Sequence, residues 1–133
     1  KCFANVMIVL HIINEVNDQL TLHTMTYQQR QQIEQVLIEI IDELGGDPKD
    51  INNGDCTTFA KMAYDKLRSQ FDVVIVDNLC EVMSDELEGY PTKGTDVDFS
   101  KISHCYLEIE GSFFDAFDVK GVSDEYDLEY HNI

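Results

Sequence analysis

Three residues of this sequence have side chains whose chemistry and order along the chain suit nucleophilic catalysis. Cys56 follows a short polar stretch and begins an apolar helical pattern, while His104 and Asp115 lie in two strand-like runs further along. A thiolate is a strong nucleophile, an imidazole can carry its proton near neutral pH, and a carboxylate can orient that imidazole. The order cysteine, histidine, aspartate therefore predicts a site for hydrolysis or acyl transfer.

The surroundings predicted for Cys56 favour the thiolate. Apolar residues from Asp55 to about Gln70 recur at helical spacing, so Cys56 falls in the first turn of a helix, on its buried face. Asn53 or Asp55 is expected to cap that turn, and the unpaired N–H groups of a helix start stabilise negative charge. Gly54 would let a substrate backbone approach closely. A single cysteine on an apolar face is more often a core residue, so its partners decide the interpretation.

The partners come from a predicted β-hairpin. The runs His104–Ile109 and Ser112–Phe117 flank Glu110–Gly111, which is a signal for a two-residue turn. With that turn, His104 and Asp115 are diagonal neighbours on one face of the sheet. A three-residue loop would put them on opposite faces instead. The two-residue turn thus predicts an imidazole beside a carboxylate, with a hydrogen-bonded surface pair as the simpler alternative.

These motifs resemble those of the papain/transglutaminase-like cysteine hydrolases. The run Gly54-Asp-Cys56-Thr-Thr-Phe59-Ala60 is similar to the nucleophile motif of transglutaminase-like proteins, and the run from His104 to Asp115 is similar to their histidine and aspartate strands. Papain-like cell-wall peptidases share the order of the three groups. The resemblance covers roughly residues 53–118. It implies a papain/transglutaminase-like core with a cysteine nucleophile, a histidine base and an orienting aspartate.

The sequence departs from these family patterns where the oxyanion and the substrate would bind. Tyr106 stands where the transglutaminase pattern commonly has a tryptophan, and no papain-type glutamine precedes the cysteine. Oxyanion stabilisation would then rest on the Cys56 backbone N–H, with the side chains of Asn52 or Asn53 as further candidates. Asn52, Asn53 and Tyr106 are therefore the expected oxyanion or substrate-contacting residues.

The clearest of the surrounding elements is a helix from about Thr26 to Leu44. Thr26 and Gln29 match a capping box, and Gly45–Gly46 followed by Pro48 ends the helix. A polar loop, Asp47–Asp55, is expected to connect it to the helix of the nucleophile. The helical spacing makes one apolar stripe of Ile33, Val36, Leu37, Ile40, Ile41 and Leu44.

The second half of the chain is predicted to be strand-rich. Asp72–Leu79 contains a β-branched run typical of a buried strand, and Cys80–Ser100 is expected to form a short helix or turn and then a surface loop. From Asp118 onward we expect irregular structure. Helices first and strands afterwards predict one α+β domain over residues 1–133, with helices on one side of a small antiparallel sheet.

The net charge and the spacing of the cysteines argue against several classes of function. The 26 acidic and 9 basic residues give a net charge of −17, which repels phosphate and argues against nucleic-acid binding and against anionic membranes. The charge suits a cationic partner, or solubility alone. The four cysteines lack the close pairs of zinc sites, and the C-terminal acids lack the spacing of a calcium loop, so no metal or other cofactor is expected. These cysteines are Cys2, Cys56, Cys80 and Cys105.

Residues 1–24 are interpreted as an N-terminal arm or strand. The apolar run Cys2–Ile13 is too short to span a bilayer and is not followed by a small-residue cleavage site. A degenerate signal peptide, or foreign sequence ahead of a natural start at Met25, are the alternatives. Without a secretory signal, reduced thiols and a cytoplasmic location are expected.

Two functions follow from these patterns. The leading hypothesis is a small cysteine peptidase, amidase or acyl transferase that acts on a peptide or amide substrate, which the charge would favour being cationic. The alternative is a non-catalytic acidic protein that binds a basic partner or mimics nucleic acid, based on the net charge and on the acidic segments Asp85–Glu88 and Asp124–Glu129. Cys105 alternates with His104 along its strand, so it is expected to face the core.

Overall fold

The computed structural model describes residues 25–78, 85–95 and 104–132 of the chain, and its first element is helix α2, Tyr27–Glu43. The Thr26 hydroxyl accepts a hydrogen bond from the Gln29 N–H at 3.1 Å, and the Gln29 side chain accepts one from the Thr26 N–H at 2.9 Å. Gly45 and Gly46 follow with φ of 112° and 87°, a conformation that ends helices. The predicted helix, its capping box and its end are thus confirmed.

The segment predicted as a polar loop, Asp47–Asp55, is helical instead. Helix α3 spans Pro48–Asp50. Asp47 is its N-cap, and the Asp47 side chain accepts a hydrogen bond from the Lys49 N–H at 2.9 Å. A π-helical turn, η1, covers Ile51–Asp55 and runs directly into helix α4, Cys56–Leu67. Polar composition indicated a loop, but an aspartate N-cap followed by proline at the first helical position is a helix-start signal.

This helical segment changes the environment expected at the start of α4. Asp55 makes no side-chain capping hydrogen bond, and Asn53 lies inside the π-helical turn. The prediction that Asp55 or Asn53 caps a free helix start was therefore wrong. A π-helical turn pairs N–H groups with carbonyls five residues earlier, so helical backbone already precedes Cys56.

The sheet has four strands in the order β2-β1-β3-β4. Strand β1 pairs antiparallel with β3 and parallel with β2, so the sheet is mixed and the predicted all-antiparallel sheet was wrong. The parallel neighbour is only two residues long and pairs with Ile75 and Val76, which left little pattern in the sequence to indicate it. The strands are β1, Val73–Asn78; β2, Thr92–Lys93; β3, His104–Ile109; and β4, Ser112–Phe114.

The hairpin β3–β4 has the predicted two-residue turn. Ile109 pairs with Ser112, and the turn residues Glu110 and Gly111 have φ of 51° and 85°. Positive φ at both turn positions is typical of the type I′ turn that joins tightly paired strands. Strand β4 ends earlier than predicted, because Asp115 turns the chain away from the sheet.

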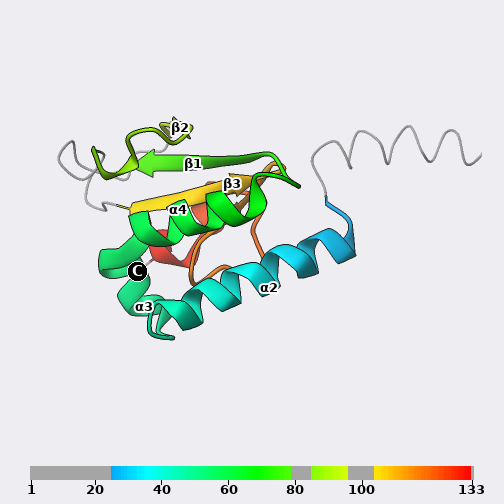
Figure 1. The fold of residues 1–133 in the computed structure, drawn as a ribbon, viewed down its shortest axis with the longest axis horizontal. Coiled ribbons are helices and arrows are strands. Elements are labelled where there is room, and N and C mark those ends of the chain that lie inside the picture. Colours follow the sequence, from blue (N-terminus) through cyan, green and yellow to red (C-terminus); the bar gives the residue numbers. More distant parts are fainter. Residues whose placement is uncertain (1–24, 79–84, 96–103, 133) are drawn as a thin grey trace, which may run out of the picture.

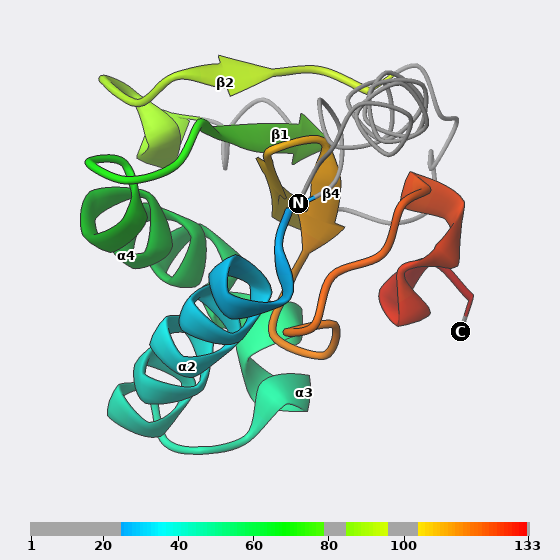
Figure 2. The ribbon, with the colours of Figure 1, turned by 90° about the vertical axis from the view of Figure 1, so that its right-hand side faces the viewer.

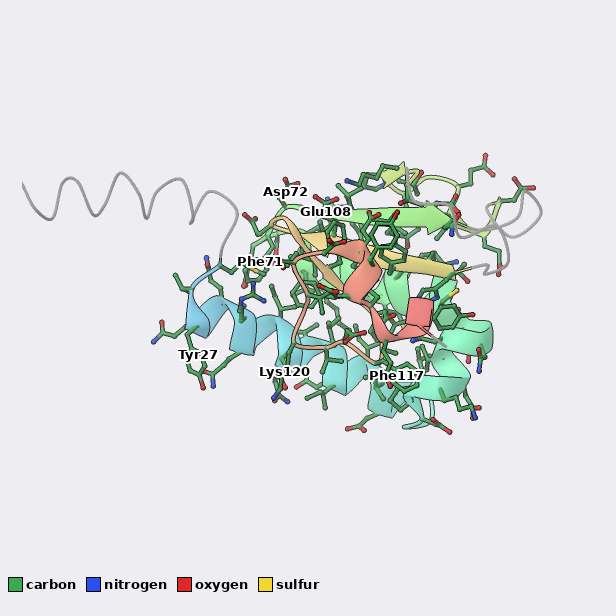
Figure 3. The ribbon with its side chains drawn as sticks, turned by 180° about the vertical axis from the view of Figure 1, so that it is seen from behind. Tyr27, Phe71, Asp72, Glu108, Phe117 and Lys120 are labelled. Carbon is green, nitrogen blue, oxygen red and sulfur yellow. The ribbon has the colours of Figure 1, made fainter. Side chains whose placement is uncertain are left out.

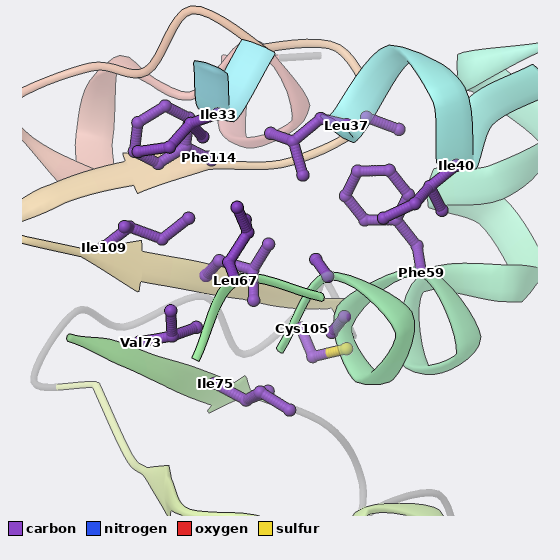
Figure 4. Packing of buried hydrophobic residues seen from close by; sticks show 14 of the residues in the cluster. Ile33, Leu37, Ile40, Phe59, Leu67, Val73, Ile75, Cys105, Ile109 and Phe114 are labelled. Atoms are coloured by element: carbon purple, nitrogen blue, oxygen red, sulfur yellow. The ribbon is translucent and has the colours of Figure 1, made fainter. Parts of the chain in front are cut away.

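Helices α2 and α4 cover one face of the sheet, and helix α4 lies between α2 and strands β1 and β3 (Figures 1 and 2). The main core fills the space between these helices and that face, as Figure 4 shows. The stripe predicted on α2 supplies four buried residues to it, with Val36 and Leu44 partly buried at its margin. Fully buried members include Ile33, Leu37, Ile40, Ala60, Ala63, Ile75, Leu107, Ile109 and Phe114. The observed class is therefore α+β.

The C-terminal residues lie on the other face of the sheet. Two 3-10 turns, η3 at Glu125–Asp127 and η4 at Glu129–Asn132, carry this segment across the strands (Figure 3). Leu128 between them is fully buried against Val76 and Tyr106, forming a second, smaller cluster. The tail predicted to be irregular is thus largely short turns, and it packs on the sheet.

Several predictions fall on residues outside the described part of the chain. These are the N-terminal arm with Cys2, and the stretch around Cys80. Of the predicted Cys80–Ser100 region, the described residues form a 3-10 turn, η2, at Asp85–Leu87 and then strand β2. In the residues that are described, no helix has the length and apolar character needed to cross a membrane.

Candidate functional site

The candidate site centres on a buried histidine–aspartate pair. The His104 Nε2 and the Asp115 Oδ2 are 3.0 Å apart, and the two side chains are 0% and 1% exposed. His104 is the first residue of β3, and Asp115 directly follows the end of β4. The two-residue turn therefore brings them together as predicted from the hairpin register.

Asp115 is held in place by its second oxygen. Its Oδ1 accepts hydrogen bonds from the backbone N–H groups of Phe117 at 2.9 Å and of Asp118 at 2.8 Å. An aspartate that bonds the backbone two and three residues onward forms a local turn, which ends β4 here. One carboxylate oxygen thus fixes the turn, while the other faces the imidazole.

Cys56 lies beside this pair on a different element, helix α4, whereas His104 and Asp115 come from the β3–β4 hairpin. It is the first residue of α4, which packs on β3, and it is 4% exposed. Its side chain lies close enough to Cys105 and His104 for both to lower the pKa of its thiol. The three residues predicted for the site, Cys56, His104 and Asp115, therefore lie near one another, where helix α4 begins against strand β3.

The thiol of Cys56 is strongly acidified in this environment. A hydrogen bond from the Cys105 thiol is the largest cause; burial opposes it, and contacts with His104 and the Cys105 backbone add to it, so that the pKa of Cys56 falls from 9.0 to about 4. The same contact raises the pKa of the Cys105 thiol. Of these two neighbouring thiols, Cys56 is the one whose surroundings favour the thiolate, because His104 also lowers its pKa.

The pKa of the His104 imidazole is shifted in the opposite direction to that of the Cys56 thiol. Burial disfavours its charged form, but the hydrogen bonds and charges of Asp115 and Cys56 outweigh burial and raise the pKa of His104 above its ordinary 6.5. A thiolate and an imidazolium side by side are the protonation states that these shifts favour near neutral pH. Such a pair has a nucleophile and a proton donor already in place.

Of the three residues expected at the oxyanion or substrate, Asn52 has the most suggestive position. It lies in the π-helical turn four residues before Cys56, is 2% exposed, and neither polar atom of its amide has a hydrogen-bond partner among the described residues. Asn53 is exposed to solvent. Tyr106 is buried beneath Leu128, with its ring 5.7 Å from that of His104.

Two residues that contact the site were not predicted for it. Cys105 was expected only in the core, where it does lie, but its contact with Cys56 follows from its place on the face of β3 that meets α4. Tyr130 stacks on the His104 ring, with ring centres 4.0 Å apart and planes 21° from parallel. The only signal for Tyr130 in the sequence was an aromatic residue near Leu128 in an otherwise acidic tail.

Within the described ranges, no group of three or more His, Cys, Asp or Glu residues is arranged to hold a metal ion. Comparison of this chain with protein-family models, with curated proteins and with solved structures finds no match. The site is therefore interpreted from its own geometry and chemistry.

Proposed function

We propose that this protein is a cysteine hydrolase or acyl transferase that acts on amide or related acyl bonds. The observation that carries the proposal is the buried His104–Asp115 pair, 3.0 Å apart, with the acidified thiol of Cys56 close to the imidazole. Perturbed pKa values of neighbouring groups are typical of functional sites. A cysteine that merely filled the core would need neither a charged partner nor a buried carboxylate behind that partner.

The first half of the reaction forms an acyl-enzyme. The Cys56 thiolate attacks the carbonyl carbon, and a tetrahedral intermediate forms with negative charge on the carbonyl oxygen. Because Asp115 holds Nε2 of His104, the Nδ1 side of the ring delivers the proton to the leaving nitrogen as the C–N bond breaks. The amine departs and a thioester remains on Cys56.

The second half regenerates the thiolate. Neutral His104 removes a proton from water, or from an acceptor amine in the transferase case, as its oxygen or nitrogen attacks the thioester. The new acid or amide leaves, and Cys56 recovers its negative charge beside the imidazolium. Asp115 keeps the ring oriented through both halves and stabilises its charged form.

We assign the stabilisation of the oxyanion to the side-chain amide of Asn52. The π-helical turn engages backbone N–H groups ahead of Cys56, which weakens the case for a purely backbone donor. A buried amide without a partner costs folding free energy, and a developing oxyanion would provide the missing acceptor. We therefore favour Asn52 over the exposed Asn53 for this role.

An active ester tests the proposal without knowledge of the natural substrate. Mixed with p-nitrophenyl acetate, the protein should release a burst of nitrophenolate equal to the protein present, and intact mass should show one acetyl group on Cys56. Cys56→Ala should abolish both signals, and Cys80→Ala, a thiol deletion elsewhere in the sequence, should leave both unchanged. A full burst from the Cys56→Ala protein would rule out the proposed nucleophile.

A specific observation also favours the alternative, an acidic protein that binds a basic partner. A hollow of about 600 Å³ is lined by acidic and aromatic side chains on and after η2, including Asp85, Glu88 and Tyr90. Binding of a lysine-rich peptide there should weaken steeply as salt rises to physiological strength, because exposed charges are then screened. Asp85→Asn with Glu88→Gln should weaken binding, whereas an affinity that ignores salt would contradict this alternative.

A further inference from the structure

The proposed catalytic site is closed in this structure. Cys56, His104 and Asp115 are 4%, 0% and 1% exposed, so a substrate carbonyl has no direct access to the sulfur. One face of the His104 ring is covered by Tyr130, at a ring separation of 4.0 Å. Tyr130 also lies close enough to Cys56 and Asp115 for their charges to help raise its pKa, after burial as the main cause. The aromatic ring thus covers His104, the middle residue of the proposed site.

The segment that carries Tyr130 is attached through Leu128, Glu129 and Glu125. Leu128 is buried against Val76 and Tyr106. The Glu129 N–H donates to the Asp118 Oδ2 at 2.8 Å, and the Thr95 hydroxyl donates to the Glu125 carboxylate at 2.6 Å. The segment consists of short 3-10 turns and belongs to no strand of the sheet. Short turns that lie outside the sheet and the long helices open locally at lower free energy than core strands or helices do.

We propose that residues 124–130, the C-terminal cover, are a closing device whose Tyr130 lies where an acyl substrate must enter, and that the cover leaves the site before Cys56 reacts. The packing of Leu128 is the anchor that attaches the cover to the sheet, and the hydrogen bond from the Glu129 N–H to Asp118 helps to hold the cover closed. The inference rests on the proposed function only in naming the covered site as catalytic. The closing itself is a statement about access to a thiol, which can be measured without turnover.

The test is the rate at which iodoacetamide alkylates Cys56, followed by mass spectrometry of the peptide. Tyr130→Ala should raise that rate by roughly tenfold or more, because it removes the ring while leaving the Leu128 anchor. The matched control is Tyr27→Ala on helix α2, where the residue is 75% exposed, and its rate should equal that of the unaltered protein. An unchanged or slower rate in Tyr130→Ala would overturn the proposal and make Tyr130 a fixed wall of the site.

A second measurement uses the unaltered protein and so does not depend on whether a variant folds. If the cover opens locally, the alkylation rate should stay nearly constant as urea is added below the unfolding transition. If Cys56 is reached only by global unfolding, the rate should rise from the first additions of urea with the slope of the whole protein, which would overturn the proposal.

The two proposals can fail separately. Fast alkylation in Tyr130→Ala without any acetyl burst would keep the cover and reject the enzyme. A stoichiometric burst from the unaltered protein together with no effect of Tyr130→Ala on alkylation would keep the enzyme and reject the cover.

Discussion

Asp115 does two jobs with its two oxygens. Oδ1 accepts two backbone hydrogen bonds that form the turn after β4, and Oδ2 faces the His104 ring. The two jobs can be separated, because asparagine keeps one carbonyl oxygen for the turn but offers an N–H₂ group to the imidazole. A donor at that position favours the tautomer that carries its proton on Nδ1, the wrong side for a base toward Cys56.

Asp115→Asn should therefore fold with nearly normal stability but react slowly. The corresponding change in the serine-protease triad lowers kcat by about 10⁴-fold, and we expect a loss in that direction in the acetyl-release assay. Asp115→Ala also removes the turn bonds and leaves buried partners unpaired, so it should cost about 3–5 kcal/mol of the free energy of unfolding. Urea unfolding of both variants checks the distinction, and equal destabilisation by the two would contradict it.

Cys105 should tune the nucleophile. Its thiol provides the largest contribution that lowers the pKa of Cys56 to about 4, so Cys105→Ala should raise that pKa. In the unaltered protein the alkylation rate of Cys56 should be nearly independent of pH between about 5 and 8, because the thiolate is already formed. In Cys105→Ala the rate should climb with pH within that range, and a flat profile in the variant would show that Cys105 has no such effect.

At the scale of elements, the site is made where a helical segment meets a hairpin. The segment from Pro48 to Leu67 brings Cys56 onto β3, and the π-helical turn within it contains Gly54. Gly54 does not have positive φ, and a Cβ added there would meet no atom within 4 Å. The backbone therefore does not require glycine at this position, and a small side chain would have room there.

Gly54→Ala should leave the free energy of unfolding unchanged or raise it by about 0.4–1 kcal/mol, because the unfolded chain loses freedom. Gly121→Ala is the contrast, since φ there is 83° and the new Cβ would lie 2.6 Å from the Phe114 ring. We expect it to cost about 1–3 kcal/mol. If Gly54→Ala keeps its stability but slows the acetyl burst, the open space serves substrate approach; a large loss of stability would refute this account of the position.

At the scale of the whole molecule, the sheet separates two different layers. Helices α2 and α4 with the main core lie on one face, and the C-terminal cover with a small cluster lies on the other (Figures 2 and 3). Cys56 and His104 are enclosed between these layers, so the ionisation of both side chains is coupled to folding. A group whose pKa is lowered on folding stabilises the protein above its unfolded value, and this stabilisation fades as pH falls toward the folded value.

The pH dependence of stability should show this coupling between about pH 6.5 and 4. Below 6.5 His104 is protonated in both states, so its contribution is complete, while Cys56 is a thiolate only in the folded state. Stability should thus fall with decreasing pH by up to about 1.4 kcal/mol per unit from Cys56. Urea unfolding of the unaltered protein and of Cys56→Ala at each pH separates the contribution of Cys56 from that of the carboxylates. If the free energy of unfolding of the two proteins changes with pH in the same way, the prediction is contradicted.

Local patterns in the sequence were enough to predict several parts of this protein. The capping box at Thr26, the stripe on α2, and the turn at Glu110–Gly111 each depend on residues close together in the chain. Because side chains alternate along strands, the turn length alone implied that His104 and Asp115 share a face. Those two residues, and Cys56 at the beginning of α4, were therefore accessible from sequence.

Only the tertiary structure decided the rest, because it depends on contacts between residues far apart in the chain. The parallel pairing of β2 with β1 has no local pattern, and the helical form of Asp47–Asp55 is favoured by the burial of Ile51, which a count of polar residues misses. The acidity of Cys56 comes from its contact with a second thiol on β3. The covering of His104 by Tyr130 requires the chain to return across the sheet, and packing of Leu128 holds it there.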